Sequence, residues 1–179
     1  MLVFKYQLTE EEYFEFNYYT FWTAPFRKKY RWIYYLRLLL LYLPVAVLYI
    51  SLNRVHNLYI DIAVFAVIAV FFIFLIPYFV KRSVRKRTKQ ILAEPENKHI
   101  IGICEVQLSD TGIVDKDSAS ETKYIWDAIV RRAETDQCIF LYTNSHHAIV
   151  IPKRVIKNAE EKKELDRMLA KHLPLAVEW

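Results

Sequence analysis

The sequence predicts a membrane hairpin of two α-helices followed by a small α+β domain. Two apolar runs, 32–52 and 58–80, each contain a single charged residue. Lysine and arginine gather just outside both runs, and short β-rich stretches separated by turn residues follow them. With 179 residues, the chain has room for a membrane anchor and one small domain but not for two large hydrophobic cores.

The composition excludes the common nucleotide-binding motifs. The chain contains two glycines, Gly102 and Gly112. Glycine-rich phosphate loops and dinucleotide fingerprints need more, because larger residues obstruct their backbone conformations and the close approach of the phosphates. We therefore expect no cofactor of this class, and no other cofactor is indicated.

The cysteines and histidines do not form a metal-binding pattern. Cys104 and Cys138 lie in predicted strands on the cytoplasmic side, where disulfides are rare, so we expect two reduced, buried thiols. His146 and His147 are neighbours that would point to opposite faces of a strand. Because a zinc site needs three or four converging ligands, we expect no metal.

Residues 1–31 are predicted to form a strand and an amphipathic helix. The stretch 2–8 alternates in polarity as a strand does, and the sequence leaves open whether this strand joins the C-terminal sheet. Thr9 followed by Glu12 is a capping box, so a helix is expected from about Glu10 to Trp22. This helix has more aromatic residues than a single buried face would need. We expect some of them to contact the bilayer interface or the cytoplasmic domain.

The two apolar runs, which together make up the hairpin 32–80, are long enough to cross a bilayer. They contain 21 and 23 residues, a helix rises about 1.5 Å per residue, and the hydrocarbon core is about 30 Å thick. Buried helices of a soluble protein would show a polar stripe with a period of 3.6 residues, which neither run has. The polar link 53–57 allows a tight turn and nothing larger, so the helices are expected to form a hairpin.

The distribution of cations predicts the orientation of the hairpin. Lysine and arginine are retained on the cytoplasmic side, and the link contributes one cation, Arg54. Both termini of this multi-pass chain are therefore expected in the cytoplasm. The basic stretch 81–94 is expected to continue the second helix to about Ala93, before Pro95. The two basic clusters consist of Arg27, Lys28, Lys29 and Arg31 before the first run and Lys81, Arg82, Arg85, Lys86, Arg87 and Lys89 after the second.

Residues 95–179 are predicted to form small antiparallel strands and a closing amphipathic helix. This order is the outline of a pleckstrin-homology-like (PH-like) split barrel, and the composition also permits other small β domains. Trp126 is expected to pack between sheet and helix. The predicted strands are 100–109, 112–114, 122–126, 128–134, 138–143 and 147–152. In the helix, Asn158 is the expected cap, Leu165, Met168, Leu169 and His172 share one face, and Pro174 closes the end.

The order of these features resembles the YcxB-like proteins of bacteria. The resemblance rests on "LTEEEYFEFN", the two-span hairpin, "SDTGI", "YIWDAI", "CIFLYTNSHHAIVIPKR" and "EEKKELDRML", and its most specific part is Trp126 to Arg154. It implies a PH-like cytoplasmic domain on a hairpin in the cell (inner) membrane. It implies no catalytic residue, and Arg37 inside the first span departs from what the family leads us to expect.

The leading functional hypothesis is a non-enzymatic, membrane-tethered module that recruits a protein or peptide partner. The alternative is recognition of anionic lipid headgroups by the two basic clusters, with Lys153 and Arg154 as further cations that open toward solvent and could face the membrane or a ligand. The retention of cations on the cytoplasmic side of the membrane explains the same clusters without any lipid recognition. The oligomeric state is open.

Two other function classes are less well supported by the sequence. An enzyme would have to use His99, His146, His147, Asp127, Ser145 or the cysteines, and none of these has a nucleophile–base spacing that is compatible with the predicted strands. Nucleic-acid binding is not expected, because the cations gather at the bilayer edge and not along an aromatic-lined groove.

Overall fold

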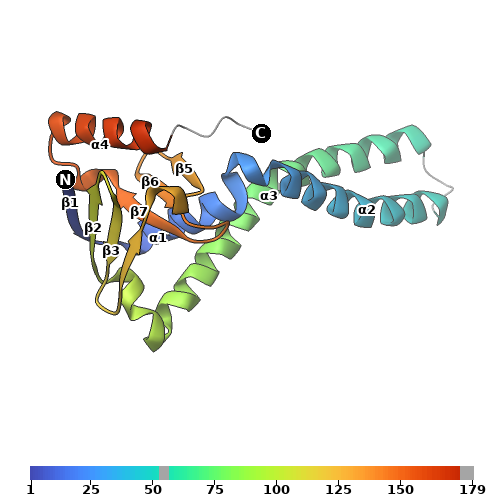
Figure 1. Ribbon diagram of the computed structural model, residues 1–179. Helices are drawn as coiled ribbons and strands as arrows, with labels where there is room; N and C mark the ends of the chain where they lie inside the picture. Colours follow the sequence, from blue (N-terminus) through green and yellow to red (C-terminus); the bar gives the residue numbers. More distant parts are fainter. Residues whose placement is uncertain (53–56, 174–179) are drawn as a thin grey trace.

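The computed structural model describes residues 1–52 and 57–173, which form a helical hairpin and a β-rich domain at one end of it (Figure 1). Most of the predicted link 53–57 and the predicted helix stop at Pro174 lie outside the described residues. The hairpin extends away from the β-strands, and the second half of its longer helix returns along the domain (Figure 1).

The strands among the described residues form two antiparallel sheets and no closed barrel. The first sheet has the order β1-β2-β3-β4 and the second the order β5-β6-β7. The N-terminal strand therefore joins the sheet of the C-terminal domain, with Tyr6 paired to Cys104. The strands are β1 Leu2–Gln7, β2 Ile103–Ser109, β3 Gly112–Lys116, β4 Glu121–Tyr124, β5 Arg131–Glu134, β6 Cys138–Tyr142 and β7 Ala148–Pro152.

Several predicted strand boundaries were wrong, and the predicted strands 122–126 and 128–134 are shortened by the 3₁₀ helix η4 Trp126–Ala128 between them. The chain before β2 is a 3₁₀ helix, η3 Pro95–Ile101, because Pro95 occupies its first turn and the Gly102 N–H closes it on the His99 carbonyl. The pair His146 and His147 lies in the turn before β7 and not in a strand. The Asn144 side chain accepts both of their backbone N–H groups, which favours a tight turn over an extended chain.

The core lies between the two sheets and is closed by the C-terminal helix α4 Ala159–His172. Its N-cap is Asn158, and Leu165, Met168 and Leu169 are buried, as the sequence predicted. Trp126 packs between sheet and helix, also as predicted. Its ring stacks on His172 with centroids 4.6 Å apart, and its indole N–H donates to the Ser109 carbonyl at 2.9 Å.

The predicted helix 10–22 is present in two parts, α1 Glu10–Tyr18 and the π-helical η1 Tyr19–Thr23. The widened turn is closed by the Ala24 N–H, which donates to the Tyr19 carbonyl. Pro25 then begins the short 3₁₀ helix η2 Pro25–Arg27, which leads into the hairpin.

The hairpin consists of α2 Lys28–Leu52 and α3 Leu58–Ala93. The end of α3 confirms the prediction that the basic stretch continues the second helix. Both helices are long and apolar enough to cross a membrane, and 6% of the apolar window of each is buried. Core helices of a soluble protein would be mostly buried, so the exposed apolar surface favours the membrane interpretation.

Candidate binding cleft and basic clusters

The first helical turn of α1 connects the domain to α3 through consecutive glutamates. The Glu10 carboxylate lies 3.5 Å from Lys89 Nζ, and Glu11 pairs with Arg85 at 2.7 Å. The Arg85 guanidinium also lies over the Phe14 ring, 4.2 Å from its centroid. These contacts hold α1 against the basic half of α3.

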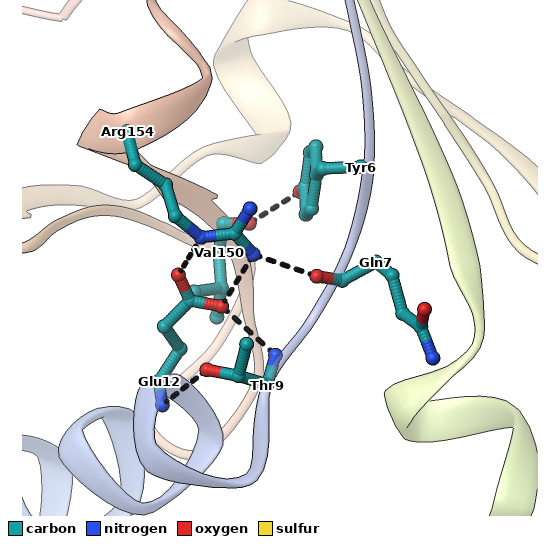
Figure 2. A network of polar contacts seen from close by, with 6 residues as sticks. All are labelled: Tyr6, Gln7, Thr9, Glu12, Val150 and Arg154. Atoms are coloured by element: carbon teal, nitrogen blue, oxygen red, sulfur yellow. Dashed lines mark hydrogen bonds and ion pairs between the residues drawn. The ribbon is translucent and has the colours of Figure 1, made fainter.

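The third glutamate, Glu12, points to the other side and pairs with Arg154 (Figure 2). Arg154 Nε donates to Glu12 Oε1 at 2.6 Å and Nη2 donates to Oε2 at 3.0 Å and to the Gln7 carbonyl at 2.7 Å. The Thr9 N–H donates to the same carboxylate at 2.8 Å, which completes the predicted capping box. Burial opposes ionisation of Glu12, but the hydrogen bonds from Arg154 and Thr9 outweigh it and lower its pKa.

An open cleft of about 840 Å³ lies between α1, the basic half of α3 and the two sheets. Its size is typical of small-molecule and peptide sites, roughly 300–1,000 Å³. The α3 wall is formed by Ser83, Val84, Arg87, Thr88 and Ile91. The cleft therefore lies directly below the apolar part of α3, at the end where the cations gather.

The floor of the cleft belongs to the inner face of the first sheet. One rung of that face carries Phe4, Val106, Asp115 and Thr122. Asp115 thus lies beside buried apolar side chains and also lines the cleft. Burial, with a further contribution from Asp117, raises the pKa of Asp115 to about 6. The floor is acidic, whereas the α3 wall contributes the cation Arg87.

The edge of the second sheet forms another wall, because β6 is the one neighbour of β7 among the described strands. Leu141 is paired with Ile149 in the register of the two strands. The Thr143 N–H donates to the His147 carbonyl, so every second residue from His147 onward directs its backbone N–H and carbonyl toward β6. By alternation, Ala148 and Val150 direct their backbone groups away from β6. Both line the cleft, and the Val150 carbonyl accepts the Tyr6 hydroxyl (Figure 2).

The histidines near the cleft do not converge with other ligands on one point. His146 stacks on Phe21 with ring centroids 5.8 Å apart and contacts Arg27. His99 bonds through Nδ1 to the Glu96 carbonyl. Within residues 1–52 and 57–173, no group of three or more histidine, cysteine or acidic side chains could hold a metal ion.

The two cysteines are free thiols. Cys138 is buried in β6, and Cys104 is half-buried in β2 at the edge of the cleft. Burial raises the pKa of Cys104 to about 11 and that of Cys138 to about 12. Both remain protonated at neutral pH and are poor nucleophiles.

The structure divides the predicted site residues into two groups. Six cations contact other parts of the chain: Arg27 and Arg31 donate to backbone carbonyls, Arg85 and Lys89 pair with α1, Lys153 pairs with Glu134 at 2.6 Å, and Arg154 pairs with Glu12. The sequence did not indicate these partners, because they lie up to 142 residues away. The side chains of six more cations make no hydrogen bond or ion pair with a described residue: Lys28, Lys29, Lys81, Arg82, Lys86 and Arg87.

The segment from the last residues of β2 into α4 contains β3 to β7, including the β7 edge, and most of the closing helix. Residues 108–169 match the YcxB-like protein family. The match confirms the resemblance inferred from the sequence, and this YcxB-like region includes Asp115, Ala148 and Arg154. The hairpin and α1 lie outside the matched range. No curated protein and no solved structure matches the chain.

Proposed function

We propose that this membrane-anchored chain is a non-enzymatic binding module whose cleft takes an extended segment of a partner protein. The observation that carries the proposal is the edge of β7 inside the cleft. An extended peptide can add to such an edge as a further strand, with backbone hydrogen bonds giving affinity and neighbouring pockets giving specificity. Ala148 supplies its N–H and carbonyl for this pairing and Val150 supplies its N–H, because the Val150 carbonyl already accepts the Tyr6 hydroxyl.

The charges of the cleft specify the chemistry of the partner segment. Asp115 on the cleft floor and Asp117, which follows β3, both line the cleft that contains the β7 edge. A lysine or arginine of the bound segment would be stabilised there, and its charge would favour ionised Asp115. The partner segment is therefore extended and carries a basic residue.

The family resemblance supports the remaining parts of the proposal. It implies a PH-like domain, a scaffold type used for recognition, and two sheets covered at one end by α4 are compatible with that architecture. The cations flanking the hairpin support a cytoplasmic position for both termini. The protonated thiols, the bond of His99 to a backbone carbonyl and the bond of His146 to Arg27 support a binding role over a catalytic one.

Photo-crosslinking in native membranes tests this function. A photoreactive amino acid is placed at Thr122 inside the cleft or at Lys163 on the outer face of α4, and adducts are resolved by mass spectrometry. The proposal predicts a discrete protein adduct from position 122, mapped to an extended basic segment, and none from position 163. Equal labelling from both positions, or no adduct from position 122, contradicts it.

A further inference from the structure

The two membrane helices leave an apolar groove between them near the basic end of the hairpin. The groove has a volume of about 470 Å³ and is lined by Trp32, Leu36 and Leu39 of α2 and by Ala69, Phe72 and Ile73 of α3, among others. At its far end, the Tyr42 hydroxyl donates to the Phe65 carbonyl at 2.7 Å and the two rings pack 5.9 Å apart. The helices are thus fastened beyond the groove, which remains open along its length.

The groove needs an apolar occupant when the hairpin lies in a bilayer. Leu39 and Ile73 are 44% and 53% exposed, so the groove faces the surroundings of the hairpin and not the protein interior. The hydrocarbon core of a membrane contains no water that could fill it. An acyl chain or an apolar helix is the group that fits.

Unpaired cations lie at the mouth of the groove. Lys28 and Lys29 precede Trp32 by four and three residues, which places them one helical turn away on the same face of α2. Neither side chain makes a hydrogen bond or ion pair with a described residue. Lys81 follows the groove residue Ile76 on α3 by about 8 Å along the helix axis.

We propose that the groove binds one acyl chain of an anionic membrane lipid, whose phosphate lies against Lys28 and Lys29. A helix of a second copy fits less well, because it would bring identical cations to the same level of the membrane. A lipid phosphate instead supplies the opposite charge. The site is separate from the cleft beside β7, so each can fail without the other.

The test uses the full-length chain in lipid nanodiscs that contain equal parts of phosphatidylcholine and phosphatidylglycerol. A photoactivatable acyl chain is carried by one lipid or the other, and crosslinks are mapped by mass spectrometry. The anionic probe should label 32–42 and 69–76 several-fold more than the zwitterionic probe. Changing Lys28 and Lys29 together to glutamine should reduce this preference about fivefold or more. The matched control, Lys162→Gln with Lys163→Gln on α4, should retain it.

Filling the groove separates the acyl site from the headgroup contact. Ala69→Phe places a ring in the groove and should abolish labelling of 32–42, whereas Val67→Phe, at a residue 69% exposed and outside the groove lining, should not. Leu39→Trp gives a second filling variant on the other helix. Labelling spread evenly over the hairpin, equal labelling by both lipids, or crosslinks between two copies at the groove would overturn the proposal.

Discussion

Arg154, in the 3₁₀ helix η5 Lys153–Val155 that follows β7, forms a two-pronged ion pair with Glu12 in the first turn of α1, across 142 residues of sequence. The Glu12 side chain is 8% exposed and that of Arg154 is 50% exposed. Because Glu10 and Glu11 bind α3, the segment Glu10–Glu12 fixes the β domain relative to α3. The cleft lies between the elements that these ion pairs connect.

Glu12→Gln should destabilise the chain more than Glu11→Gln. Loss of the Glu12 charge leaves Arg154 without its carboxylate and should cost about 1–2 kcal/mol. Glu11 and Arg85 are both exposed, so Glu11→Gln should cost less than about 1 kcal/mol. Thermal unfolding of both variants in detergent measures the difference, and equal losses would contradict the role given to Glu12.

The contribution of Asp115 to the stability of the domain should fall as the pH rises from about 4 to 6. The folded chain holds the Asp115 proton with a pKa of about 6, above the ordinary value of 3.8, so folding favours the protonated form. The stabilising contribution is complete below pH 4 and is lost as the pH rises through 6, with an upper limit of about 3 kcal/mol.

Asp115→Asn should remove this contribution. Denaturant unfolding of wild type and variant at pH 4 and pH 7 checks it, because the free energy of unfolding of the wild type relative to that of the variant should fall between these two pH values. Glu12, whose pKa is lowered, acts in the opposite direction and destabilises only as the pH falls through its lowered pKa. An identical pH profile for wild type and Asp115→Asn would show that Asp115 is not the group responsible.

Ala148→Pro should abolish partner binding without unfolding the domain. Proline removes the N–H that points away from β6, and proline is tolerated at the free edge of a sheet. Ala148→Val keeps that N–H and is the matched control. With the photoreactive residue at Thr122, the adduct should disappear in the proline variant and persist in the valine variant. If proline leaves the adduct unchanged, strand addition at β7 is wrong.

Gly112→Ala should destabilise the turn between β2 and β3. Gly112 has φ of +155°, and a Cβ atom there would lie 2.3 Å from the Tyr124 carbonyl oxygen. The expected cost is about 1–3 kcal/mol. Thr111→Ala, at an exposed residue of the same turn, should change the free energy of unfolding by less than about 0.5 kcal/mol. Denaturant unfolding compares the two, and similar small effects would show that the backbone constraint is absent.

Features set by neighbouring residues could be predicted from the sequence. The capping box of Thr9 and Glu12, the Asn158 cap and the end of α3 at Ala93 depend on residues within one or two helical turns. The predicted strands were correct in order and approximate in extent. They failed where Asn144 builds a turn that the apolar pattern of β7 does not indicate.

The cleft could not be predicted, because its walls come from α1, α3 and both sheets. Nothing in the neighbourhood of Arg154 indicates Glu12 as its partner, and nothing near Asp115 indicates that it lies on a rung with Phe4. The division of the cations into paired and unpaired groups has the same cause. Arg85 and Lys81 look equivalent in sequence, but α1 packs beside Arg85.

The most direct test of the account is a topology measurement on the full-length chain. Reporters active on one side of the membrane are fused to the N-terminus, to the C-terminus and within the link 53–57, and membranes are washed with alkaline carbonate. The account predicts that the chain stays in the membrane, that both termini report the cytoplasm and that the link reports the opposite side. Termini on opposite sides, or release of the chain by the wash, would contradict it.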